Sequence, residues 1–208
     1  MKKFPISLKK EFSVFKKMNT PAKIQDFVNG IPINFEVGKR TCRSPLQVLK
    51  NKEAHCMEGA LLAAAVLWHN GEPPILLNLR TTDDDYGHVL AIFKRRGRWG
   101  ALTKTNHAVL RYRDPVYTSV RELAMSYFNE YFLDSGKKTM RSYSAPFGLS
   151  KYGSDWLVSK KNLWKLFDDF MASKHFSVLD KKTIRDLRPA DKIEIKAGKI
   201  TEWKKPRG

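Results

Sequence analysis

Three residues of this chain follow one another in an order that suits thiol chemistry. Cys56 opens an apolar stretch, His88 begins a predicted strand after a polar loop, and Asn106 follows the next predicted strand. Attack of sulfur on an amide carbonyl needs a thiolate, and a free thiol with a pKa of roughly 8.5 is mostly protonated at neutral pH. A helix N-terminus favours the thiolate through its unpaired N–H groups and partial positive charge. We therefore predict that Cys56 is a nucleophile.

A histidine in contact with such a thiol would hold its proton and deliver it to the leaving amine. Among the five histidines, His88 is placed best, because it heads a strand beside a polar loop. A third polar side chain must bond the other ring nitrogen to fix the tautomer. We assign this role to Asn106, and Thr103 or a missing third member stay open as alternatives.

The same residue types are also typical of purely structural positions. Free cysteine is among the most buried residue types, and a histidine at a strand edge is commonly structural. We interpret His55 and His107 as loop residues and His69 as a helix-end cap. The acidic run at residues 83–85 is interpreted as a solvated turn, because no compact set of metal ligands accompanies it. No metal and no cofactor are expected.

Capping and breaking signals predict the elements that must position these residues. A capping residue followed by proline predicts helices over residues 21–30 and 45–51. Residues 56–69 are apolar on nearly every side, which predicts a helix in the domain centre. Alternating or apolar runs predict strands at residues 75–79, 88–94 and 99–105, with a hairpin turn between the last two.

The second half of the chain is predicted to be mainly helical. Ser119 and Glu122 form a capping-box pattern, which begins a helix that closes at Gly136. Residues 137–154 are polar and basic, which indicates a loop. Residues 155–178 predict a helix, and two short stretches at the end, 192–196 and 199–203, predict a strand pair. The predicted class is α+β, a cysteine-led central helix packed on a small antiparallel sheet with flanking helices.

Charge divides the chain into a neutral middle and basic flanks. The net charge is +18, with 12 basic against 4 acidic residues in 1–55, 9 against 9 in 56–135, and 18 against 8 in 136–208. Basic flanks of this kind can hold nucleic acid or an acidic partner, or simply form a solvated surface. We divide the chain into a basic N-terminal arm (1–19), a core domain (20–135) and a basic C-terminal extension (136–208).

Compartment signals favour a cytoplasmic protein. Two cysteines are too few for a disulfide framework. The basic start is interrupted by further charges before an apolar run of signal-peptide length. The longest apolar run, residues 60–68, is far shorter than the roughly 20 residues of a membrane span.

The motifs carry a resemblance to a known family. The order of a cysteine-led helix, a Gly87-His88 strand and a hairpin before Trp99 resembles the transglutaminase-like superfamily of papain-type cysteine enzymes. The resemblance covers residues 20–135 and is clearest over 54–106. Within it, the chain is similar to bacterial transglutaminase-like proteins of unassigned activity. It implies that Cys56 is the nucleophile and His88 the base of a Cys-His-Asp triad.

The third position departs from the family pattern. Family members commonly carry an aspartate four residues after the hairpin tryptophan, where this chain has Thr103. Asn106 is the expected substitute, as asparagine serves in papain-like enzymes. The implied function is a cysteine-dependent amide-bond enzyme, a peptidase, amidase or acyl transferase with a peptide or amide substrate. The alternative is a weak or inactive binding module, and the oligomeric state stays open.

Overall fold

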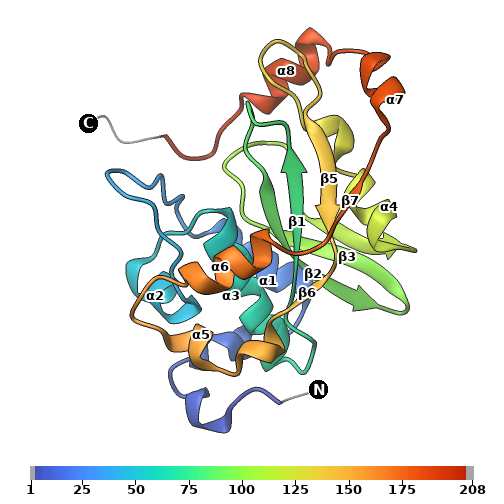
Figure 1. Cartoon of the computed structure of the whole chain (residues 1–208). Coiled ribbons are helices and arrows are strands. Elements are labelled where there is room, and N and C mark those ends of the chain that lie inside the picture. The colour runs from blue at the N-terminus through green and yellow to red at the C-terminus, as the bar shows by residue number, and fades with distance from the viewer. Residues whose placement is uncertain (1–2, 205–208) are drawn as a thin grey trace.

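In the computed structural model, which describes residues 3–204, helix α3 (Cys56–His69) packs against one face of an antiparallel sheet (Figure 1). Every residue of α3 from 57 to 68 is buried, as expected of a helix that is apolar on all sides. The first two residues of the expected N-terminal arm and the last four of the C-terminal extension lie outside the described residues. Within 3–204, no helix is long and apolar enough to cross a bilayer.

The remaining elements surround α3. The other helices are α1 (Pro21–Asn29), α2 (Pro45–Asn51), α4 (Val120–Met125), α5 (Asp155–Val158), α6 (Trp164–Met171), α7 (Lys181–Arg185) and α8 (Lys192–Gly198). The strands are β1 (Ile75–Thr81), β2 (His88–Arg95), β3 (Arg98–Thr103), β4 (Arg113–Tyr117), β5 (Met140–Ser144), β6 (Phe147–Gly148) and β7 (His175–Ser177). Short 3-10 turns lie at Ile6–Leu8, Ser13–Lys17, Phe128–Glu130 and Leu149–Tyr152.

The strand order is β4-β3-β2-β1-β5-β7, with β6 pairing β1, and every one of these pairs is antiparallel. Leu90 pairs with Thr103 across β2 and β3. Because side chains alternate between faces, His88, two residues before Leu90, shares a face with Thr103 as its diagonal neighbour. The register alone therefore brings the start of β2 and the end of β3 together.

Helices cover both faces of the sheet. One core joins α1, α2, α3, α5 and α6 to one face, and the second core joins α4 and the segment after it to the other face. Figure 1 shows α1, α3 and α6 on one side, α4 on the opposite side, and α8 beyond the end where β1 ends. Phe4, Phe12 and Phe15 of the N-terminal segment are buried in the first core.

The sequence predictions for the first half are confirmed closely. Helices α1 and α2 begin where their capping signals stand, with Thr20 and Ser44 accepting hydrogen bonds from the first turns, and α3 spans the predicted apolar run. The strands at β1, β2 and β3 are also present. The class is a mixture of helices with an antiparallel sheet, as expected, but the sheet has seven strands and is larger than predicted.

Three predictions in the second half are wrong. Residues 137–154 form β5 and β6, because pairing with β1 outweighs their polar composition. The long helix predicted over 155–178 is instead two short helices, α5 and α6, separated by residues 159–163 and followed by the strand β7. The predicted strand at 192–196 is instead the helix α8, since Asp191 and Glu194 form a capping box ahead of it.

One boundary also moves, and one strand is new. Helix α4 ends at Met125, and a 3-10 turn at Phe128–Glu130 replaces the rest of the helix expected to reach Gly136. The strand β4 was not predicted, because Asp114-Pro115 indicates a break. Proline is tolerated there because β4 is an edge strand.

Candidate active site

Cys56 is the first residue of α3, and its side chain is half-buried. His55 precedes it as the helix cap, and a reciprocal capping box links His55 to Glu58. The first turn leaves backbone N–H groups without intrahelical partners and concentrates the positive end of the helix dipole at the sulfur. This is the position that the apolar run and its start predicted for Cys56.

The thiol of Cys56 is hydrogen bonded to two imidazoles, those of His55 and His88. Burial by itself would raise the pKa of the thiol, but the hydrogen bonds from His55 and then from His88 outweigh it and lower the pKa to about 5. A thiol with such a pKa is ionised at neutral pH. The two rings therefore keep Cys56 in its nucleophilic form.

His88 is held by a hydroxyl. Its Nε2 lies within hydrogen-bond distance of the Thr103 Oγ1, and Oγ1 in turn donates to the backbone carbonyl of Leu110 at 3.1 Å. Because that hydroxyl donates its only hydrogen to the Leu110 carbonyl, it can act only as an acceptor toward His88. Nε2 therefore carries a hydrogen in the neutral ring, and Nδ1 keeps the lone pair that a base needs.

The strand end that carries Thr103 is fixed from the helical side. The buried side chain of Gln25, in α1, accepts from Thr103 N at 3.0 Å and donates to Thr103 O at 2.8 Å. Gly59 of α3 permits a close approach here, because a Cβ at that position would lie 2.4 Å from the Cβ of Lys104. These contacts set the start of α3 against the end of β3.

Asn106 does something other than orient His88. Its Nδ2 donates to Trp203 O at 2.8 Å, and its Oδ1 accepts from Trp203 N at 2.8 Å. Both functional atoms of the amide are therefore committed to the C-terminal segment. The contact to the His88 ring is made by Thr103, which needs no bulge or register shift because it already shares the face of His88.

His55 is the residue that the sequence interpretation missed. Its Nε2 lies 2.9 Å from the carbonyl oxygen of Thr41, 3.6 Å from Glu58 Oε1 and 3.8 Å from Glu36 Oε1. Burial lowers the pKa of His55, but the hydrogen bond and charge of Cys56 and the charge of Glu58 outweigh it and raise the pKa to about 9. The signal in the sequence was a histidine directly before a cysteine, with a glutamate three residues later.

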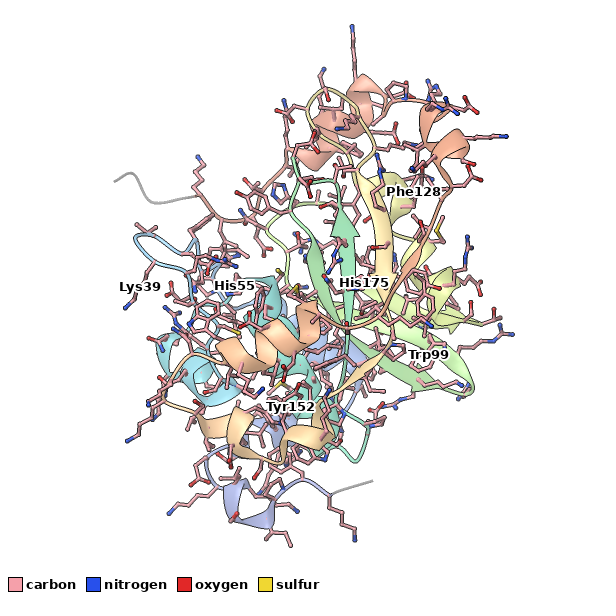
Figure 2. The ribbon with its side chains drawn as sticks, viewed as in Figure 1. Lys39, His55, Trp99, Phe128, Tyr152 and His175 are labelled. Carbon is pink, nitrogen blue, oxygen red and sulfur yellow. The ribbon has the colours of Figure 1, made fainter. Side chains whose placement is uncertain are left out.

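Glu58 is fully buried beneath His55 and is satisfied by hydrogen bonds. Its oxygens accept from Thr41 Oγ1 at 2.8 Å, Asn34 Nδ2 at 3.1 Å, Arg43 N at 3.0 Å and His55 N at 3.3 Å. A carboxylate with this many donors is held firmly in one place. The position of His55 among the helices is labelled in Figure 2.

A pocket of about 370 Å³ opens onto the sulfur. Cys56, His55 and His88 line it, together with Tyr131, whose buried hydroxyl has no hydrogen-bond partner among residues 3–204. Its other walls are Ile33, the loop that precedes β2, the loop that follows β3, residues 130–134 and the end of α8. A group of a few atoms can therefore reach the sulfur of Cys56 from outside.

The acidic run at residues 83–85 is taken up by contacts within the chain. Asp84 pairs with Lys137 at 2.7 Å, and Asp85 accepts from Tyr86 N and the Thr139 hydroxyl. Within the described part of the chain, no three His, Cys, Asp or Glu side chains gather as metal ligands would.

Comparisons with known proteins give little beyond the geometry. No protein-family model matches the chain, and no curated protein matches it. Among solved structures it is similar to Legionella pneumophila LapG (EGTA-treated), with 11% identity over 72% of this chain and 82% of that one, and a TM-score of 0.40. This is a distant relationship in fold at most, and no statement about chemistry follows from it.

Proposed function

We propose that this protein is a cysteine-dependent enzyme that acts on an amide or related acyl bond, a peptidase, amidase or acyl transferase of the transglutaminase-like, papain-type class. The observation that carries the proposal is the Cys56 thiol at a helix N-terminus in contact with two imidazoles. A sulfur kept ionised beside an accessible pocket is arranged for attack and not for packing.

The roles follow from the contacts. Cys56 attacks the carbonyl carbon and forms a C–S bond, and the backbone N–H of Cys56 stabilises the oxyanion. His88 protonates the leaving amine, after which the thioester is attacked by water or an amine whose proton returns to His88. Thr103 orients the His88 ring through Nε2. The hydroxyl of Tyr131 is a second candidate donor to the oxyanion, since it lines the pocket without a partner among residues 3–204.

The test uses an activated aryl ester, p-nitrophenyl acetate, as a general acyl donor. The wild type should release nitrophenol in a burst and carry an acetyl group on Cys56, as located by mass mapping of peptides. Cys56→Ala should abolish both while still folding and unfolding cooperatively, and Cys42→Ala is the matched control that should keep both. Equal turnover in Cys56→Ala and the wild type would remove the assignment, and the binding-module alternative would then stand.

A further inference from the structure

His55 has contacts that differ from those of His88 in a systematic way. Its Nε2 faces the Thr41 carbonyl at 2.9 Å, with Glu58 and Glu36 within 4 Å. All three are acceptors, so they favour a hydrogen on Nε2 and a positive charge on the ring. The partner of His88 is a neutral hydroxyl, which accepts the Nε2 hydrogen and brings no negative charge that would favour the charged ring over the neutral one.

The other ring nitrogen of His55 has two possible partners. Nδ1 accepts from Met57 N at 3.3 Å as a helix cap, and the ring also contacts the Cys56 thiol. A neutral ring can cap the helix, whereas a charged ring must give up that contact and can donate to sulfur instead. The cap contact is long, so exchanging it for a bond to a thiolate is favourable.

We infer that His55 is a second imidazole of the catalytic site, one that stays charged and holds the Cys56 thiolate while His88 alone moves protons. This inference rests on the proposed function and deepens it. Four charges then balance: Glu58 faces the His55 imidazolium, and the thiolate faces the His88 imidazolium. The sulfur of Cys56 then keeps a positively charged partner in His55 even after His88 has given its proton away.

The proton accounting assigns a different role to each ring. In acylation the C–S bond forms, the C–N bond breaks, and the proton on His88 leaves with the amine. In hydrolysis His88 takes a proton from water as the C–S bond breaks, and the thiolate returns. His55 gains and loses no proton in either step. Its Nε2–H stays hydrogen bonded to the carbonyl oxygen of Thr41, and its positive charge is balanced by Glu58.

Other charged groups near His55 do not alter this balance. Arg43 lies 4.0 Å from Glu58 through Nε, but its NH1 is paired with Glu53 at 2.8 Å. Glu36 adds a further negative charge from the loop before α2. The surroundings of His55 are therefore net negative once Cys56 is ionised.

The experiment compares asparagine variants of three histidines. His55→Asn keeps a good capping residue, His88→Asn removes the proton carrier, and His69→Asn is the matched control at the other end of α3, outside the pocket. For each variant, the rate of Cys56 alkylation by iodoacetamide and the turnover of p-nitrophenyl acetate are measured as functions of pH. Alkylation at Cys56 is identified by peptide mass mapping.

We expect His55→Asn to move the alkylation midpoint up by about one pH unit or more and to recover turnover as the pH is raised. His88→Asn should show no steady-state turnover of the ester at any pH, although its sulfur still alkylates. His69→Asn should follow the wild type. An unchanged midpoint in His55→Asn, or the same shift in His69→Asn, would overturn the inference, whereas an unreactive Cys56 in the wild type would overturn the proposed function first.

A second readout needs no activity. The ring protons of His55 can be titrated by NMR in the wild type and in Cys56→Ala. The pKa of His55 should fall once its partner sulfur is removed, since Cys56 is the largest of the contributions that raise it. An equal pKa in both proteins would contradict the inference even if His55→Asn failed to fold.

Discussion

The two cysteines of this chain show how the surroundings of a thiol decide what it does. Cys42 is fully buried, and its peptide group is bonded to Asn162 and Leu163. Burial and the charge of Glu58 raise the pKa of Cys42 to about 12. Cys56 faces a pocket and two imidazoles, and its pKa is lowered to about 5. Hydrogen-bond donors at the sulfur, more than burial, separate a reactive thiol from a packing residue.

The largest expected effect is a difference in reactivity between the two thiols. At pH 6 and in the folded protein, iodoacetamide should alkylate Cys56 at least about a hundredfold faster than Cys42, because only Cys56 is ionised and accessible. Mass mapping after short exposure measures both rates in one sample. In unfolding denaturant the two rates should become equal. Preferential labelling of Cys42 in the native protein would reverse the comparison.

The next effect concerns the partner of His88. Thr103→Val keeps the shape of the side chain but removes the acceptor for Nε2, so turnover of the aryl ester should fall roughly tenfold to a hundredfold, a part of the 10²–10⁴ that positioned proton transfer supplies. Asn106→Ala is the control, because its amide binds Trp203 and not the ring. A larger loss in Asn106→Ala than in Thr103→Val would return the orienting role to Asn106.

A smaller effect links Cys56 to the pH dependence of stability. Between the lowered pKa of Cys56, about 5, and the higher pKa of an ordinary thiol, the unfolded chain binds a proton that the folded protein lacks, so stability rises with pH. Above 6.5, His55 has the opposite effect, because its pKa is raised to about 9 and the folded protein keeps the proton. The net rise is therefore confined to about pH 5–6.5 and amounts to about 2 kcal/mol.

Urea unfolding at a series of pH values measures this rise directly. The wild type should gain stability between pH 5 and 6.5 and change little from there to pH 9. Cys56→Ala should lose the rise, because the thiolate that drives it is gone. Parallel stability curves for the two proteins would show that the thiol of Cys56 titrates in the same way in both states.

The smallest expected effect is on packing. Cys42→Ala removes a buried sulfur and should cost about 1 kcal/mol of unfolding free energy through the cavity it leaves. Cys56→Ala, at a half-buried position, should cost less than this at pH 5. Denaturant midpoints of the two variants compare them, and a larger cost for Cys56→Ala would indicate that its thiol serves the fold.

The sequence was informative where a signal is local. Capping residues before proline marked α1 and α2, and the apolar run of α3 identified both its burial and the place of Cys56. The strand β5 was hidden because its stability comes from pairing with β1 and not from its own polar composition. Residues 192–196 alternate like a strand, but the cap at Asp191 makes them helical.

The candidate site was predictable in some of its residue types and not in its pairings. Cys56 and His88 were chosen from position and chemistry, and the fold brings them into contact. The partner of His88 depends on strand register, which changes with the exact length of the hairpin turn; a two-residue turn pairs Arg95 with Arg98 and therefore Leu90 with Thr103. The role proposed for His55 depends on Thr41, which lies in the loop before α2 and contacts both His55 and Glu58.

The central claim is that Cys56 is a thiolate at neutral pH. The most direct measurement is the ultraviolet absorbance of thiolate as a function of pH, recorded as the difference between Cys42→Ala and a variant that also carries Cys56→Ala. The account predicts a single transition near pH 5. A transition near the ordinary thiol value of roughly 8.5 would contradict it and leave Cys56 as a structural residue at the start of α3.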